Sequence, residues 1–239
     1  MIIPAIVLSL IFGSLGFIVT KNNAKYLLSG YNTMSEAQRA KMDLEGYLHF
    51  FKRFHIVLGI SLLAITLILS IFSNNWASGF MIMFPLVSYL YLIIKGNSFY
   101  KDAKAQKLAT YFGCGILIVV IGIVGTLQFA SNKNNDLKFS QDVLEINGLY
   151  GLDIEKKNII KLDLVTELPP ISYRSNGYAA GDYAKGSFKA KNGKTIKLFV
   201  NKSVKSLVCF QTTQGDIYYN SADEDMNKLY KKIMQWRGL

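Results

Sequence analysis

Four long apolar stretches without an ionisable side chain constrain this 239-residue chain more than any other feature. They cover residues 2–19, 56–72, 77–94 and 108–130 and contain no Asp, Glu, Lys, Arg or His. A helix needs roughly 17 to 25 residues to cross the hydrocarbon core of a bilayer. Each stretch is therefore predicted to be a transmembrane helix, and the chain to be a multi-pass protein of the cell membrane.

The composition changes near residue 131. Residues 1–131 hold 10 basic and 4 acidic side chains, whereas residues 132–239 hold 17 basic and 12 acidic ones. This contrast excludes one uniform soluble domain, and the clustered apolar content excludes a disordered chain. We expect a four-helix transmembrane domain over residues 1–131 and a soluble domain over 132–239, which is long enough for its own core.

The basic residues of the first part predict its orientation. All ten lie in the loops after the first and third stretches, and the loop between the second and third stretches, residues 73–76, carries no charge. The positive-inside rule places the two basic loops in the cytoplasm, and therefore both termini and the soluble domain outside it. Lys133 and Lys138 follow the fourth stretch, but two residues do not outweigh ten.

The first cytoplasmic loop, residues 21–55, carries its own helix signals. Thr33 with Glu36, or Ser35 with Gln38, forms a capping box that predicts a helix start. Apolar residues then recur every three or four positions, at Leu44, Leu48, Phe51 and Phe54 or His55. This stripe predicts an amphipathic helix that either lies on the inner leaflet or packs as a solvated loop helix.

Two of the apolar stretches carry small residues at helical spacing. Small residues allow helix backbones to approach closely in lipid, so these positions are predicted to pack helices together. They are Ser9, Gly13 and Gly16 in the first stretch and Gly115, Gly122 and Gly125 in the fourth.

The soluble part has the pattern of strands followed by one helix. Apolar and polar residues alternate over 160–165 and 196–200, and Asn192-Gly193 and Gln214-Gly215 mark hairpin turns. Ser221 with Glu224 forms a capping box before an apolar stripe. These signals predict about seven strands in a small barrel or sandwich, with the C-terminal helix plugging one end.

Several short segments of the soluble part resemble the bacterial pleckstrin-homology (PH)-like domains that are fused to membrane helices. The resemblance implies an all-β PH-like barrel with a C-terminal capping helix. The basic residues that bind phosphoinositides in eukaryotic relatives are missing, because residues 138–152 hold Lys138 against Asp142 and Glu145. The matching segments are Gly148-Leu149-Tyr150-Gly151, Arg174-Ser175-Asn176-Gly177, Lys185-Gly186-Ser187-Phe188 and Lys197-Leu198-Phe199-Val200.

A second resemblance concerns the first cytoplasmic loop. Residues 28–35 are similar to the signature of a family of small bacterial membrane proteins of unknown function, and the similarity extends over residues 1 to about 130. The family has no established activity to carry over. The resemblance marks a candidate functional motif in the loop, formed by Gly30, Tyr31, Asn32, Thr33 and Met34.

One segment of the soluble part is predicted to be a binding surface. Residues 173–185 combine three Tyr and an Arg with Gly and Asn in a predicted loop, a composition enriched at interfaces. The alternative is a flexible connection between strands whose tyrosines cover the flank of the barrel. The candidate residues are Tyr173, Arg174, Asn176, Tyr178, Tyr183 and Lys185.

Catalytic and metal-binding patterns are not found in the sequence. His49 and His55 lack a Cys or a paired carboxylate at ligand spacing and are read as interfacial or packing residues. Cys114 lies in a membrane stretch and Cys209 in a predicted strand, so they form neither a disulfide nor a Cys-His dyad. We expect no catalytic residue, no metal and no cofactor. The scattered charge of the soluble part, 17 basic against 12 acidic residues, does not indicate nucleic-acid binding.

These observations predict a non-enzymatic bacterial integral membrane protein whose four-helix anchor displays a PH-like domain that binds a protein or peptide. Its partners are then the lipid bilayer and that protein or peptide. An envelope-sensing or signalling module is the alternative. A transporter or membrane enzyme is disfavoured, because ionisable groups at membrane depth usually mark such functions.

Overall fold

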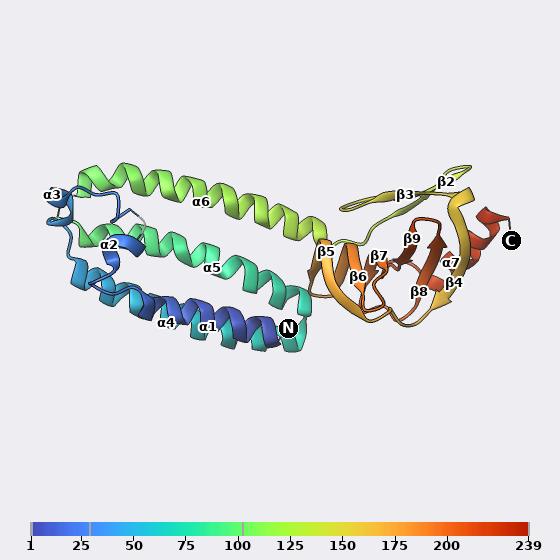
Figure 1. The fold of residues 1–239 in the computed structure, drawn as a ribbon, viewed down its shortest axis with the longest axis horizontal. Helices are drawn as coiled ribbons and strands as arrows, with labels where there is room; N and C mark the ends of the chain where they lie inside the picture. The colour runs from blue at the N-terminus through green and yellow to red at the C-terminus, as the bar shows by residue number, and fades with distance from the viewer. Residues whose placement is uncertain (1, 29, 102, 239) are drawn as a thin grey trace. The chain divides into compact units, whose positions relative to one another are not determined.

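The computed structural model describes residues 2–28, 30–101 and 103–238. The chain forms two compact units, Met1–Thr126 and Leu127–Leu239. The first unit is helical, and all strands belong to the second (Figure 1).

Long apolar helices dominate the first unit. Three of them, α4, α5 with its continuation η1, and α6, are long and apolar enough to cross a membrane. Helix α1 is also apolar but has 17 residues, about 26 Å at 1.5 Å per residue, against a bilayer core of roughly 30 Å. Length thus supports three of the four predicted transmembrane helices. The elements are α1 (Ile2–Ile18), α2 (Ala24–Leu27), α3 (Glu36–Arg39), α4 (Leu44–Phe72), α5 (Asn74–Gly96), η1 (Asn97–Phe99) and α6 (Ala103–Ser131).

The amphipathic helix predicted in the first loop is not a separate element. Its apolar stripe belongs to the first turns of α4, which runs unbroken for 29 residues. Asp43 caps its start by accepting a hydrogen bond from the Gly46 amide, 2.9 Å away. Of the two possible capping boxes, Ser35 with Gln38 is formed, and it opens only the short helix α3.

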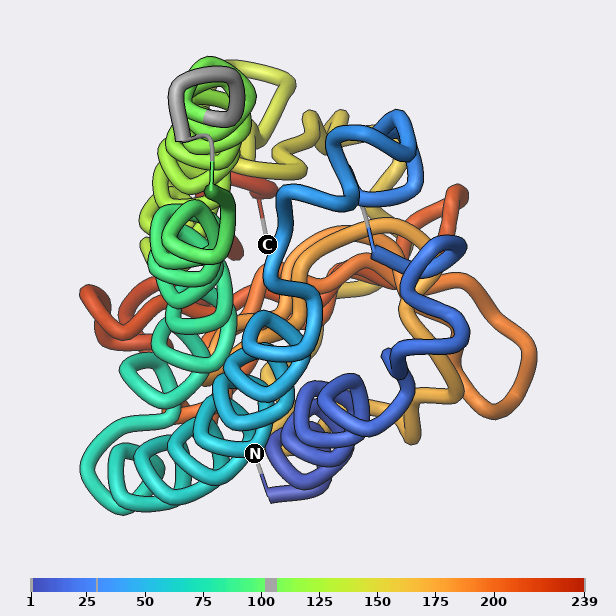
Figure 2. Tube along the Cα trace, turned by 90° about the vertical axis from the view of Figure 1, so that its left-hand side faces the viewer, coloured from blue at the N-terminus to red at the C-terminus, as the bar shows by residue number. Residues whose placement is uncertain are grey.

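Small residues bring α1 and α4 into close contact, as predicted for α1. The two helices run side by side (Figure 2). A Cβ atom added at Gly16 would lie 2.8 Å from the Lys52 carbonyl oxygen, and one added at Gly59 would lie 2.7 Å from that of Ser9. For α6 the prediction holds only at Gly125, where an added Cβ would lie 3.7 Å from the Met83 side chain of α5, because Cβ atoms at Gly115 and Gly122 would meet no described atom within 4 Å.

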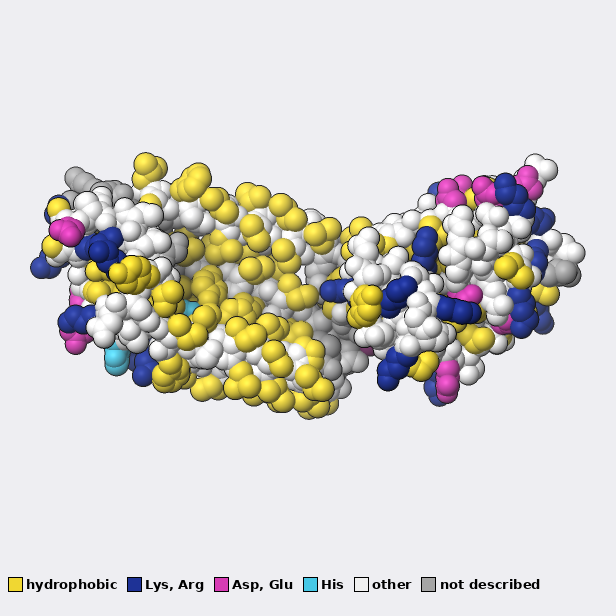
Figure 3. Space-filling model, viewed as in Figure 1, with side chains coloured by type: hydrophobic (Ala, Val, Ile, Leu, Met, Phe, Trp, Pro, Cys, Tyr) yellow, Lys and Arg dark blue, Asp and Glu magenta, His cyan; other side chains and the backbone are white. Residues whose placement is uncertain are grey.

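The two basic loops of this unit are joined at one end of the helices. The Asp43 amide donates to the Phe99 carbonyl at 2.8 Å, and the Lys101 amide donates to the Lys41 carbonyl at 2.9 Å. An isolated antiparallel bridge pairs Met42 with Tyr100 between these bonds. The loop end carries Lys and Arg side chains, whereas hydrophobic side chains cover the visible face of the helices (Figure 3).

The second unit contains two sheets and a C-terminal helix. A three-stranded antiparallel sheet has the order β1-β2-β3, and a six-stranded sheet has the order β4-β8-β9-β7-β6-β5. The strands are β1 (Leu137–Phe139), β2 (Val143–Ile146), β3 (Leu152–Glu155), β4 (Ile159–Val165), β5 (Ile171–Ala180), β6 (Tyr183–Ala190), β7 (Thr195–Asn201), β8 (Leu207–Thr212) and β9 (Gly215–Tyr219), followed by α7 (Met226–Arg237).

The predicted PH-like barrel of seven strands is wrong, because in the described part of the chain nine strands form two sheets that do not close into a barrel. Strands β7 and β9 pair in parallel, which the antiparallel hairpin pattern of the sequence did not indicate. Among the described residues no ladder joins β4 to β5, so these strands remain the edges of the larger sheet.

Local turn and helix signals are largely confirmed in this unit. Gly193 (φ 81°) lies in the turn between β6 and β7, and Gly215 (φ 119°) in the turn between β8 and β9, where positive φ favours glycine. The C-terminal helix begins later than predicted, because Asp225 rather than Ser221 caps it. The Asp225 carboxylate accepts hydrogen bonds from the Asn227 and Lys228 amides.

The apolar stripe of α7 covers one of the two hydrophobic cores of this unit. Met226, Leu229 and Ile233 are buried in a cluster with residues from both sheets. Phe210 and Tyr219 are among the most buried members of this cluster. The helix therefore packs over the sheets and not into the end of a barrel.

Candidate functional site

The predicted binding surface forms a β-hairpin and not a loop. Strands β5 and β6 pair along their length, with Tyr178 opposite Lys185 and Ala180 opposite Tyr183. The hairpin divides the six candidate residues into two groups. Tyr173, Arg174 and Asn176 are exposed, with Tyr173 at 57%, whereas Tyr178 is half-buried and Tyr183 and Lys185 are buried.

The buried candidates hold the chain segment that follows α6. The Lys185 ammonium donates to the Lys133 carbonyl, and the Tyr178 hydroxyl donates to the Asn132 side-chain oxygen at 3.1 Å. The sequence predicted that Lys185 and Tyr178 are exposed, because a lysine is rarely buried and both residues lie in a predicted loop. Tertiary contacts instead give these two side chains a structural position, so within the hairpin they are not available to a partner.

Burial lowers the pKa of Lys185 to about 8, with a smaller opposing effect from Asp136. Below pH 8 both the folded and unfolded states hold the proton. As the pH rises through 8, the folded state releases the proton, whereas the unfolded state keeps it up to an ordinary pKa of 10.5. The folded state then binds fewer protons, so the free energy of unfolding should rise by about 1 kcal/mol between pH 7 and 9.

Urea unfolding of the full chain in detergent at pH 7, 8 and 9 measures this rise. Lys185→Met keeps the side-chain volume and removes the titrating group, so the difference between wild type and variant isolates Lys185. Burial raises the pKa of Cys209 from 9.0 to about 11, so this thiol lowers stability as the pH rises from about 8, and it does so equally in wild type and variant. An identical pH dependence in the variant would contradict the assignment.

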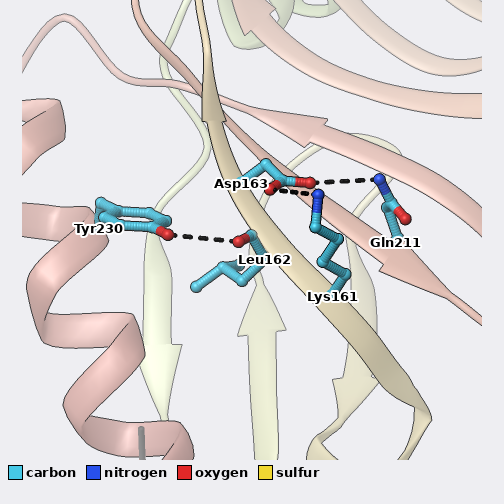
Figure 4. Close-up of polar contacts among 5 residues, drawn as sticks. All are labelled: Lys161, Leu162, Asp163, Gln211 and Tyr230. Carbon is cyan, nitrogen blue, oxygen red and sulfur yellow. Dashed lines mark hydrogen bonds and ion pairs between the residues drawn. The ribbon is translucent and has the colours of Figure 1, made fainter.

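The two edges of the six-stranded sheet differ in how they are covered. At the β4 edge, the Tyr230 hydroxyl donates to the Leu162 carbonyl at 3.3 Å, and the Arg237 guanidinium donates to the carbonyls of Ile159 and Ile160. Helix α7 thus occupies acceptors that a docking strand would need. Figure 4 shows the Tyr230 contact.

Charged and polar side chains further protect β4. The Lys161 ammonium lies 2.8 Å from the Asp163 carboxylate, which also accepts a hydrogen bond from the Gln211 amide at 3.2 Å (Figure 4). The hydrogen bond to Asp163 and its negative charge raise the pKa of Lys161, and a smaller desolvation effect opposes this rise. Charged side chains on an edge strand discourage pairing with another chain.

The β5 edge lacks such a cover. Its residues 172–176 are exposed on both faces, and no other strand pairs with its outer edge in the described part of the chain. The register shifts between Ile171 and Tyr173 and between Arg174 and Asn176, so two irregularities twist the strand. Such irregularities disfavour indiscriminate pairing of an edge strand with another chain.

The loop motif of the helical unit forms a compact turn around Arg39. The Arg39 guanidinium donates to the carbonyls of Tyr31 and Asn32 at 3.1 and 3.0 Å and lies over the Tyr31 ring. The Thr33 hydroxyl donates to the Gly30 carbonyl, so Thr33 belongs to the turn and not to a capping box. Ser29, also part of the predicted signature, lies outside the described residues.

The motif borders a pocket of about 470 Å³ at the loop end of the helical unit. Gly30 and Met34 of the motif line it, together with residues of α4, α5, η1 and α6 that the sequence did not single out. The lining consists of Leu27, Leu28, Gly30, Met34, Tyr47, Phe51, Tyr89, Leu92, Ile93, Gly96, Asn97, Tyr100, Ala109, Thr110 and Gly113. Besides the loop motif itself, tyrosines near helix ends are a sequence signal that could have indicated this pocket.

A buried histidine positions one wall of this pocket. His55 is fully buried; its Nδ1 lies 2.8 Å from the Phe51 carbonyl and its Nε2 lies 3.0 Å from the Tyr89 hydroxyl. Since a carbonyl only accepts, Nδ1 carries the proton of the neutral ring and Nε2 accepts from Tyr89. The interpretation of His55 as a packing residue is confirmed, and His49 is exposed.

Comparison with known protein families finds a match in the helical unit. Residues 6–100 match the model of a domain of unknown function (DUF3784), which covers α1 to η1 and the loop motif. No curated protein and no solved structure matches the chain. The resemblance to PH-like domains gains no support from the family comparison. The chain therefore combines apolar helices typical of a membrane protein with a sheet-rich C-terminal unit.

Proposed function

We propose that this chain is a non-enzymatic bacterial membrane protein whose sheet-rich unit binds an extended peptide segment of a partner protein. The peptide adds a strand to the outer edge of β5, so that main-chain hydrogen bonds provide affinity. Tyr173, Arg174 and Asn176 contact its side chains and provide selectivity. Tyrosine and arginine are the residues that most often dominate such contacts.

The observation that carries this proposal is the difference between the two sheet edges. Side chains of α7 occupy backbone carbonyls of β4, whereas residues 172–176 of β5 are exposed and their edge is unpaired within the described chain. An exposed edge normally invites aggregation, and folded proteins usually protect it. One protected and one open edge in the same sheet favour an edge that is kept for a partner.

The distribution of basic residues supports an extracytoplasmic position for this unit. The two basic loops are hydrogen-bonded to each other at one end of the helical unit. The positive-inside rule assigns that end to the cytoplasm. With four membrane crossings, α1 included, both termini lie outside, and the peptide partner is an envelope or extracellular protein.

A photo-reactive amino acid at position 173 tests the proposed edge in intact cells. We expect a discrete cross-linked product that disappears with Arg174→Ala and Asn176→Ala, because these changes remove neighbouring contacts without disturbing the core. The matched control is the same photo-reactive residue at Lys191, which is exposed in the turn after β6. Labelling of Tyr173→Cys by a membrane-impermeant thiol reagent in the same cells reports the side of the membrane.

Equal cross-linking at positions 173 and 191, or none at 173, would argue against β5 as the binding edge. If a cross-linked product forms at position 173 but the impermeant reagent does not label Tyr173→Cys, β5 would still be the binding edge, but the extracytoplasmic position of the unit would be contradicted.

A further inference from the structure

The pocket at the loop end of the helical unit has a wall chemistry that selects its occupant. Within the described part of the chain, no charged residue lines it. Its polar groups are phenol hydroxyls, one carboxamide and one threonine hydroxyl, set among aliphatic and aromatic side chains. A fitting ligand is therefore amphipathic, with hydrogen-bonding atoms at one end and hydrocarbon at the other.

The polar groups of the wall offer donors. Tyr89 uses its proton on His55, and the Thr110 hydroxyl donates to the Asn97 side-chain oxygen at 2.8 Å. Among the described residues, the hydroxyls of Tyr47 and Tyr100 donate no hydrogen bond, and the Asn97 amide nitrogen is similarly available. Three available donors suit a ligand that is rich in acceptor oxygens, such as phosphate and ester groups.

The surroundings of the pocket favour a negative ligand. Lys95 lies three residues after the lining residue Leu92 on α5, and Lys107 lies three residues before the lining residue Thr110 on α6, so each pair shares one side of its helix. Both lysines are exposed. Basic residues beside a pocket between membrane helices are a recognised setting for anionic lipid headgroups.

The pocket continues into an apolar surface. Leu92 and Phe51 line its interior, and Gly113 lies on the α6 side with no described atom within 4 Å of an added Cβ. Between residues 107 and 130 no position of α6 is buried. In hydrocarbon such a helix face is covered by acyl chains, since water does not enter.

We propose that this pocket binds one anionic glycerophospholipid. Its phosphate and ester oxygens accept hydrogen bonds from Tyr47, Tyr100 and Asn97, and Lys95 and Lys107 offset its charge. One acyl chain lies along the side of α6 that bears Gly113. This site does not depend on the proposed peptide-binding edge.

Native mass spectrometry of the full chain in detergent tests the site, with phosphatidylglycerol as the probe. We expect the wild type to retain one phosphatidylglycerol, and phosphatidylcholine to bind at least 10-fold more weakly. Tyr47→Phe with Tyr100→Phe should weaken phosphatidylglycerol about 10-fold, because two hydrogen bonds are lost. Tyr111→Phe, on an exposed ring of α6, is the matched control and should change nothing.

A blocking variant makes the test independent of hydrogen bonds. Gly113→Leu places a side chain in the pocket without a backbone clash, and should abolish retention of the lipid. Position 122 lies on the opposite side of α6 from position 113, so Gly122→Leu should retain the lipid. Equal retention by Gly113→Leu and wild type would overturn the proposal. Equal binding of the two lipids, or displacement by millimolar inorganic phosphate alone, would also overturn it.

Discussion

Gly186→Ala is expected to lower the free energy of unfolding of the sheet-rich unit by about 3 kcal/mol and to loosen β5. Gly186 has φ 101°, where a side chain strains the backbone. Its added Cβ would lie 2.5 Å from the Asn176 carbonyl oxygen and 2.7 Å from the Gly177 Cα. Both are backbone atoms of β5, so the strand has to move away from β6.

Gly193→Ala separates strain from collision. Gly193 also has positive φ, but its added Cβ would meet no described atom within 4 Å. Its cost should be limited to the strain, about 1 kcal/mol. Urea unfolding followed by Trp236 fluorescence, in a Trp76→Phe background, measures both variants. The Trp236 indole donates to the Ser140 carbonyl at 2.6 Å and so reports on the packing of α7.

Equal losses in the two variants would contradict the close approach of β5 and β6 at Gly186. The same variant bears on the proposed function. If β5 is displaced, photo-cross-linking at position 173 should fall with Gly186→Ala and persist with Gly193→Ala.

Gly59→Ala should cost the helical unit roughly 1 to 3 kcal/mol, because it forces α1 away from α4. The added Cβ would lie 2.7 Å from the Ser9 carbonyl oxygen and 3.1 Å from the Gly13 amide nitrogen. These are backbone atoms of α1, and no rotamer change can relieve the overlap. Close backbone contact through small residues is a main source of helix association in lipid.

Gly122→Ala makes the same chemical change on a helix face without a described neighbour within 4 Å. Alanine favours helices over glycine by about 1 kcal/mol, so this control should leave the melting temperature in detergent unchanged or raise it. Size-exclusion chromatography after heating gives the melting temperature of each variant. A fall of similar size in both would show that α1 and α4 do not meet through Gly59.

Much of the local structure could be predicted from the sequence because its causes lie within a few residues. The hairpin turns at Gly193 and Gly215 follow from turn residues between alternating strands. The apolar stripe of α7 follows from helical spacing, although Asp225 rather than Ser221 proved to be the cap. The long apolar stretches could be predicted to be helices because backbone polar groups left without a hydrogen bond in lipid are costly.

The errors concern contacts between distant residues. The barrel fails because no ladder between the described residues joins the edge strands β4 and β5, and the parallel pairing of β7 with β9 was also not predicted. Lys185 is buried because its ammonium reaches a carbonyl 52 residues earlier. The same Gly-rich sequence with tyrosine and lysine is compatible with side chains that face solvent and with side chains that contact another chain segment. No local pattern distinguishes exposed from buried positions there.

The sequence by itself determined the membrane character of the first part, the change of composition near residue 131, and most helices and turns, because solvation and backbone conformation act over short windows. Only the tertiary structure decided which sheet edge is open and which side chains of the hairpin are exposed. It also decided that Tyr47, Tyr89, Asn97 and Tyr100 share one pocket with the loop motif. The physical reason is that strand pairing and helix packing join residues far apart in the chain, and many arrangements satisfy the same local preferences.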